Sequence, residues 1–119
     1  MLKQVFVVNS GLDMGKGKVA VQTAHGEVLY MNYLAKPYSS GHAEFDVWMK
    51  DGVMKKVVLK ATLEEIISLC HMLDRSSIWY DIVRDLGLTQ VIEDSLTCIV
   101  TEPIEEEQAQ KLFGHLKLL

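Results

Sequence analysis

Four short stretches of β-branched, aliphatic and aromatic residues recur along the chain and predict four strands. They are residues 2–9 (LKQVFVVN), 53–60 (VMKKVVLK), 78–84 (IWYDIVR) and 96–101 (LTCIVT). Strands of this composition are typical of a buried sheet. Because no helix is predicted between the last two, we expect that pair to be antiparallel or separated.

Helical periodicity fills the segments between the strands. Residues 16–36 predict a long helix that ends before Pro37, and a shorter helix is expected at residues 44–50. Apolar residues at spacings of three and four predict the core-facing stripe of the long helix. This stripe comprises Val21, Ala24, Val28 and Met31.

Two further helices are expected in the second half of the chain. Thr62 and Glu65 have the spacing of a capping box, which predicts a helix start at that point. The apolar face of this helix is expected to comprise Leu63, Ile66, Ile67, Cys70 and Leu73. Pro103 suits the first turn of a final helix, and Gly114 suits its end.

Strands that alternate with helices indicate an α/β protein. The length of 119 residues suits one domain, so we expect a single domain over residues 1–119. The expected architecture is a three-layer sandwich. Its four-stranded mixed, mostly parallel sheet has helices on both faces.

Composition and charge narrow the range of functions. No apolar run approaches the ~20 residues that a membrane-spanning helix requires, and two cysteines fit a reducing compartment. We therefore expect a cytoplasmic protein with no membrane partner. Residues 1–60 carry eight lysines against five acidic residues, whereas residues 61–119 have a net charge of −7. This asymmetry leaves room for a basic face on an acidic body.

The glycine-rich segment 13–25 (DMGKGKVAVQTAH) is the strongest candidate site. It follows a strand and opens a helix, so the positive end of that helix lies beside Lys16 and Lys18, as in anion-binding sites. The spacing of Lys18, Gln22 and His25 places all three on one helical face. The segment lacks the glycine patterns of ATP-binding and dinucleotide-binding loops. A solvated helix face is the alternative interpretation.

Residues 84–90 (RDLGLTQ) form a second candidate, at the end of a predicted strand. Asp85, Thr89 and Gln90 together could orient a water molecule, and a simple turn is the alternative interpretation. The adjacent Cys70 and His71 have no partner at metal-ligand spacing, so a zinc site is not expected. No other pattern calls for a cofactor.

Together these segments resemble the type 2 peptidyl-tRNA hydrolase family. Residues 14–25 are similar to the family signature, in which a glycine-lysine loop leads into K-x-A-A-Q-x-x-H, and residues 84–90 to its D-A-G-x-T-Q segment. Residues 3–9, 55–60 and 114–118 resemble its first strand, its second strand and its C-terminal tail. Five blocks in the same order, over nearly the whole chain, make the resemblance specific.

The resemblance implies hydrolysis of the ester that joins a nascent peptide to the 3′ ribose of tRNA, by a metal-free enzyme that is frequently a homodimer. We expect Asp85 to orient or deprotonate the attacking water, and Lys18 to keep Asp85 ionised and stabilise the oxyanion. The expected catalytic residues are Lys18, His25, Asp85 and Thr89, with His25 as a competing base. The residues expected to bind the substrate are Lys16, Gln22, Lys56 and Gln90.

Two other functions stay open from the sequence. Leu86 and Leu88 stand where the family has alanine and a basic residue. A relative that only binds RNA or a protein partner, or a hydrolase of a small ester or amide, would fit these changes. A continuous basic groove joining Lys16, Lys18, Lys55 and Lys56 would favour tRNA hydrolysis, and its absence would favour the small substrate.

Overall fold

A computed structural model describes residues 1–85 and 95–119 of the chain. The helices are α1 (Lys16–Leu34), α2 (His42–Lys50), α3 (Leu63–Arg75), α4 (Glu106–Phe113) and the 3-10 turn η1 (Ser10–Leu12). The strands are β1 (Leu2–Asn9), β2 (Lys56–Ala61), β3 (Tyr80–Arg84), β4 (Leu96–Thr101), β5 (Ile104–Glu105) and β6 (Lys117–Leu118). In the described ranges, no helix is both long and apolar enough to cross a membrane.

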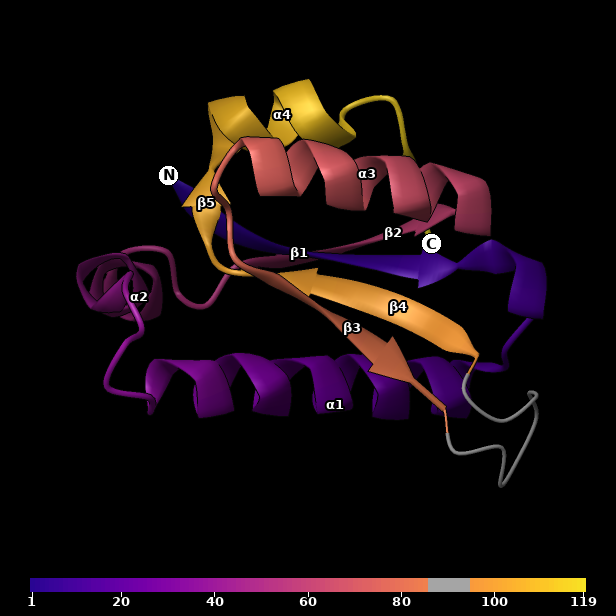
Figure 1. Cartoon of the computed structure of the whole chain (residues 1–119), viewed down its shortest axis with the longest axis horizontal. Helices are drawn as coiled ribbons and strands as arrows, with labels where there is room; N and C mark the ends of the chain where they lie inside the picture. The colour runs from indigo at the N-terminus through magenta and orange to yellow at the C-terminus, as the bar shows by residue number, and fades with distance from the viewer. Residues whose placement is uncertain (86–94) are drawn as a thin grey trace.

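One mixed sheet forms the middle layer, with α3 and α4 on one face and α1 on the other (Figure 1). The strand order is β3-β4-β1-β2-β6, and β5 pairs with the start of β1. The three layers and the α/β class are as expected from the sequence. The antiparallel pairing of β3 with β4 confirms one of the two arrangements expected for those strands.

The expectation of a four-stranded, mostly parallel sheet is wrong. The described sheet has six strands, and only the β1–β2 pair is parallel. The two additional strands, β5 and β6, have two residues each and are too short to produce a periodic pattern. Strand β4 pairs antiparallel with both β3 and β1, so that part of the sheet is antiparallel.

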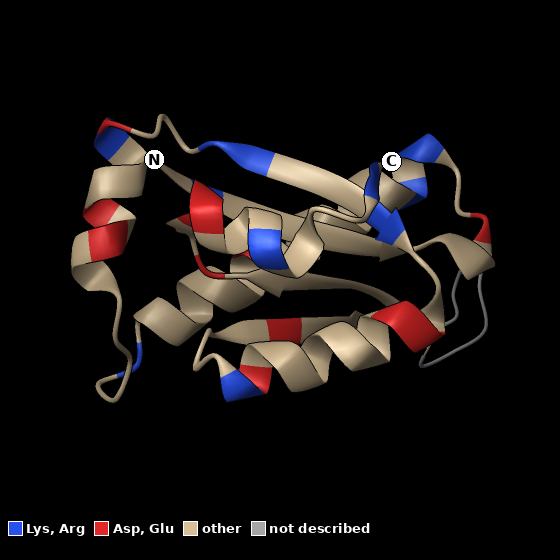
Figure 2. Ribbon diagram, turned by 90° about the horizontal axis from the view of Figure 1, so that it is seen from above, with Lys and Arg blue, Asp and Glu red and all other residues tan. Residues whose placement is uncertain are grey.

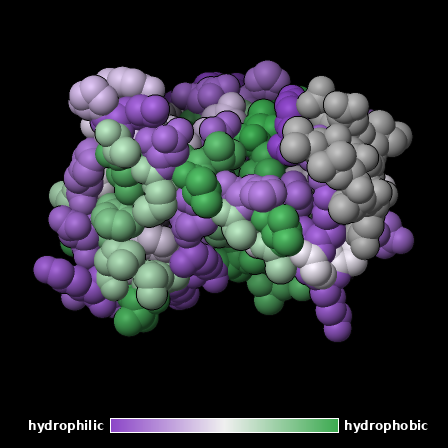
Figure 3. Space-filling model, turned by 90° about the horizontal axis from the view of Figure 1, so that it is seen from below, coloured by the Kyte–Doolittle hydropathy of each residue, from purple (hydrophilic) through white to green (hydrophobic). Residues whose placement is uncertain are grey.

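The predicted core stripe of α1 faces the wrong way. Val21, Val28 and Met31 are 49%, 66% and 37% exposed, whereas Gln22, Gly26 and Tyr30 face the sheet. A Cβ atom at Gly26 would lie 3.2 Å from atoms of Phe6 and Val100, so glycine permits the close approach of helix and sheet. Figure 3 shows hydrophobic side chains on this outer face of the molecule.

The remaining helices follow their predicted starts more closely than their predicted faces. Thr62 and Glu65 form the expected capping box of α3. The buried face of α3 comprises Ile66, Leu69 and Leu73, while Leu63 and Ile67 are nearly half exposed. Helix α4 begins at Glu106 and not at Pro103, because β5 pairs with β1 first.

Candidate active site

Helix α1 and strand β3 bring Lys18 and Asp85 together although 67 residues separate them in the chain. Lys18 lies in the first turn of α1, and its Nζ donates a hydrogen bond to Asp85 Oδ1. The two side chains are only 10% and 6% exposed. A charged pair that is so largely removed from water must remain paired, because loss of either partner leaves a buried charge uncompensated.

The end of β3 positions Asp85. Strand pairing shifts register between Val83 and Arg84, which marks an irregularity before the strand ends. The backbone N–H of Asp85 then donates to the carbonyl oxygen of Ser95 at 3.0 Å, so the two strands remain joined one residue beyond Arg84. The carboxylate is thereby held on a fixed backbone and not on a free loop.

A second polar pair lies one helical turn further along α1. Thr97 Oγ1 is 2.6 Å from Gln22 Oε1 and 3.1 Å from the carbonyl oxygen of Val83, so its single proton has two acceptors. Gln22 and Thr97 are both buried. This pair joins α1 to β3 and β4 next to the Lys18–Asp85 pair, which restrains the helix against the sheet.

Sequence reasoning missed Thr97. The signal was present, since Thr97 is a polar residue in an otherwise apolar predicted strand (LTCIVT) and the structure leaves it with no exposed surface. A buried hydroxyl needs a hydrogen-bond partner, so such a residue marks a polar contact in the core.

The neighbouring Cys98 is also buried. Burial raises the pKa of its thiol to about 12, so it stays protonated at neutral pH and is a poor nucleophile.

The other predicted site residues are not all brought together. Gln22 turns inward, whereas His25 is exposed, so the single face expected for Lys18, Gln22 and His25 does not exist. Lys16 is exposed at the start of α1. Thr89 and Gln90 lie outside the described residues, as do Leu86 and Leu88.

Lys56 lies at the far end of the sheet. Its Nζ is 3.5 Å from Glu27 Oε2 and 4.7 Å from the centroid of the Trp48 ring. Lys56 is level with Gln4 in the sheet, about five residues before the end of β1, which corresponds to roughly 16 Å along the strand. The structure therefore does not place Lys56 with the Lys18–Asp85 pair.

The continuous basic groove that would favour tRNA hydrolysis is not formed by Lys16, Lys18, Lys55 and Lys56. Lys55 contacts Glu106 and Lys56 contacts Glu27, so carboxylates neutralise both. Both lysines also lie at the end of the sheet opposite to Lys16, because β1 and β2 are parallel and α1 begins where β1 ends. By this criterion alone the surface favours a small ester or amide, and a binding surface for tRNA has to be sought elsewhere on the protein.

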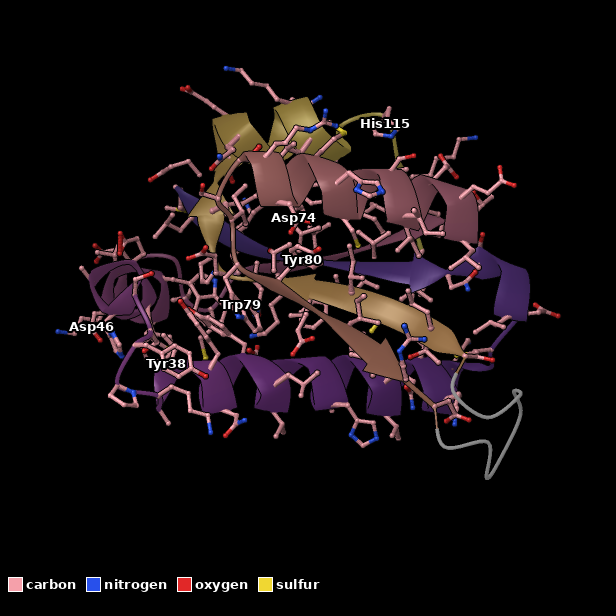
Figure 4. The ribbon with its side chains drawn as sticks, viewed as in Figure 1. Tyr38, Asp46, Asp74, Trp79, Tyr80 and His115 are labelled. Carbon is pink, nitrogen blue, oxygen red and sulfur yellow. The ribbon has the colours of Figure 1, made fainter. Side chains whose placement is uncertain are left out.

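A surface hollow of about 530 Å³ between α3 and β3 is the main alternative location for chemistry. Asp74 and Tyr80 lie close together there (Figure 4). Burial, followed by a hydrogen bond with Asp74, raises the pKa of Tyr80 to about 12, so the phenol stays neutral.

Over residues 1–85 and 95–119, no group of three or more His, Cys, Asp or Glu is arranged to hold a metal ion. The Lys18–Asp85 pair is therefore the stronger catalytic candidate.

The chain matches a known protein family and several named relatives. The family model described as "Peptidyl-tRNA hydrolase PTH2" matches residues 2–119. The chain is 39% identical to a peptidyl-tRNA hydrolase of Thermoplasma acidophilum, over 98% of this chain and 97% of the relative. It is also 39% identical to one of Nanoarchaeum equitans, over 99% of each chain, and 33% identical to one of Saccharolobus solfataricus, over the full length of both. The chain belongs to the type 2 peptidyl-tRNA hydrolase family.

Proposed function

We propose that this protein hydrolyses the ester bond of peptidyl-tRNA and releases the peptide and free tRNA. Membership of the family, and relatives of nearly equal length that carry this name, support the reaction. The observation that carries the proposal is the ion pair between Lys18 and Asp85, which is almost fully removed from water. An electrostatic group in such a site acts more strongly on a developing charge than it would in water.

In the proposed mechanism, the Asp85 carboxylate accepts a hydrogen bond from the attacking water and takes up its proton as the oxygen bonds to the ester carbon. The ammonium of Lys18 has three N–H donors, so it can hold Asp85 and also donate to the oxyanion that forms. When the tetrahedral intermediate collapses, the bond to the 3′ oxygen of the ribose breaks. That oxygen then receives the proton from Asp85, and the carboxylate is restored.

The Gln22–Thr97 pair serves this mechanism as a positioning contact. Lys18 and Gln22 are four residues apart on α1, and the two hydrogen-bonded pairs fix the helix to the ends of β3 and β4. A displacement of α1 by 1 Å would misplace Lys18, and errors of that size can cost about 100-fold in rate.

The decisive measurement is release of labelled amino acid from N-acetyl-aminoacyl-tRNA by the purified protein. We expect hydrolysis by the parent and a loss of about 10²–10⁴-fold in kcat for Asp85→Asn, because the amide retains the shape but cannot act as a base. His25→Ala is the matched comparison. Since His25 is exposed on α1, we expect a small effect from its removal. An inactive parent protein would end the proposal, and an equal loss in the two variants would reassign the base.

The proposal also includes a homodimeric, cytoplasmic enzyme. An exposed, uncharged stripe of Val21, Ala24, Val28 and Met31 on α1 supports self-association, because soluble monomers seldom expose contiguous apolar surface without a partner. Sedimentation velocity tests this point. We expect a dimer for the parent and a monomer for Val28→Asp. A monomeric parent would remove the dimer from the proposal and leave the reaction untouched.

A further inference from the structure

Two lysines face each other on strands β2 and β6, at the border of the sheet. Lys60 and Lys117 are directly opposite partners in the antiparallel β2–β6 pair. Lys60 is also opposite Val8 of β1, whose side chain packs with residues of α1. Since partners in register point to the same face of a sheet, both lysines lie on the α1 face, as does the Lys18–Asp85 pair. Both are exposed.

The arrangement of these two lysines is unfavourable in the absence of an anion. Like charges directly opposite each other on neighbouring strands destabilise the pair. Over the described residues, no carboxylate lies within 4.0 Å of either ammonium. By contrast, Lys55 and Lys56 at the other end of the sheet each contact a glutamate.

A hollow of about 270 Å³ adjoins the lysines. Its lining includes Ser10, Lys60, His115 and Lys117, and Figure 4 shows His115 in the segment after α4. Glu65 also reaches this hollow, but its Oε1 accepts a hydrogen bond from the backbone N–H of Thr62, within the helix cap. Glu65 and His115 come from the α3 and α4 side of the sheet, so the hollow lies at the edge of the sheet beside the two lysines and not on the α1 face.

The position relative to the catalytic pair suits a long polyanion. Lys60 is three strands from β3 in the sheet, which corresponds to about 14 Å at ordinary strand spacing. Lys16 begins α1 at the same end of the sheet, and Figure 2 shows basic segments gathered there, near the C-terminus. The other face is acidic at its helix starts, which are occupied by Glu64, Glu65, Glu106 and Glu107. A nucleic acid would thus approach from the α1 face.

We infer that Lys60 and Lys117, with Lys16 at the start of α1, form the phosphate-binding surface for the tRNA part of the substrate. The inference rests on the proposed function for the identity of the RNA, while the cationic surface itself rests on the strand register and the unpaired lysines. In this arrangement the RNA backbone lies along β2 and β6, and the 3′ end extends across the sheet to the Lys18–Asp85 pair.

The test measures the affinity for deacylated tRNA as a function of salt concentration. We compare the parent with Lys60→Gln, Lys117→Gln and the double variant. Lys111→Gln is the control, because it removes another exposed lysine, from α4 on the other face. Each lost phosphate contact should reduce the slope of log K against log salt by about 0.7–0.9. In the double variant the slope should be reduced by twice that amount. Its KM for peptidyl-tRNA should rise and its kcat should be unchanged.

A second readout is thermal stability. If the two lysines repel each other without a ligand, either single substitution should leave Tm unchanged or raise it, whereas a purely structural role would lower it. If the double variant hydrolyses peptidyl-tRNA with an unchanged salt slope and an unchanged KM, the inference that Lys60 and Lys117 bind phosphates is wrong. The proposed function would be unaffected by that result. A parent that lacks hydrolysis but shows the expected losses of tRNA binding would overturn the proposed function and support the surface.

Discussion

The two faces of the sheet are packed in different ways. On the α3 and α4 face, the thirteen buried residues of the core cluster are all apolar, among them Ile66, Leu73 and Ile99. On the α1 face, the polar contacts made by the helix include Gln4 with Glu27, Gln22 with Thr97, and Lys18 with Asp85. We call the α3 and α4 face, which holds the larger apolar core, the dry face, and the α1 face, which holds these polar contacts, the polar face.

The α3 and α4 face contributes mainly to stability, whereas the α1 face positions the candidate catalytic residues. Apolar burial is non-directional and scales with the area removed from water, so the α3 and α4 face stabilises the fold without fixing any one group. Hydrogen bonds are directional, and each buried polar atom must find a partner. The polar face is not fully satisfied, because Gln4 Oε1 is buried without a hydrogen-bond partner. We conclude that the α1 face gives up some stability in return for fixed positions of Lys18 and Asp85.

The largest effect is expected from removing the cation of the polar face. Lys18→Met keeps the length of the side chain but removes the ammonium that donates to the buried Asp85 carboxylate. We expect a loss of about 10²–10³-fold in kcat from the missing oxyanion donor, and a loss of about 3–5 kcal/mol in the free energy of unfolding. Peptidyl-tRNA hydrolysis and urea unfolding measure the two losses. Lys36→Met, an exposed change beyond the other end of α1, is the control; equal effects of the two variants would contradict the assignment.

The corresponding change on the dry face should affect stability alone. Ile66 has no exposed surface, so Ile66→Ala should lower the free energy of unfolding by about 2–5 kcal/mol. The kcat of the folded variant should match that of the parent, because this side chain lies on the other side of the sheet from Asp85. The neighbouring Ile67→Ala, at a position that is 48% exposed, should cost far less. A fall in kcat for Ile66→Ala would show that the two faces are coupled.

A smaller effect is expected from the Gln22–Thr97 pair. Thr97→Val preserves the shape but removes the donor of Gln22 Oε1 and of the Val83 carbonyl, which should cost about 1–3 kcal/mol in unfolding free energy. Because the pair positions α1, kcat should fall as well, with KM nearly constant. Thr23→Val is the control, since that hydroxyl contacts only carbonyls of its own helix. A stability loss with no change in kcat would limit Thr97 to a structural role.

The smallest effect concerns the cap of α3 on the dry face, and it depends on pH. Hydrogen bonds with Thr62 lower the pKa of Glu65 below its ordinary value of 4.5. This contribution to stability is therefore present above the ordinary value and disappears as the pH falls through the lowered pKa. Glu65→Gln should flatten the acid limb of Tm against pH, whereas Glu64→Gln, without a cap contact, should not. Thr62→Ala should cost about 1 kcal/mol at neutral pH without a change in kcat.

Strand bounds and helix caps could be predicted from the local sequence, whereas the buried face of a helix could not. Strands β1 and β4 have the predicted bounds, and Thr62 begins α3 as its capping pattern predicts, because strand composition and helix caps involve only neighbouring residues. The direction of a helix face is not local. The apolar residues of α1 suggested a core stripe, yet Gln22 and Gly26 face the sheet. Gln22 accepts a hydrogen bond from the Thr97 hydroxyl on β4. Gly26 allows the helix to pack closely against Phe6 and Val100.

The sequence by itself determined the α/β class, the family signature at residues 14–25, and the candidacy of Lys18 and Asp85. Only the tertiary structure decided that these two form one buried pair, that Thr97 joins the site, and that Lys60 faces Lys117 across two strands. The reason is physical. Composition and spacing reflect interactions within a few residues, whereas hydrogen bonds and charge contacts over 57 to 75 residues depend on strand order and register, which the whole chain sets at once.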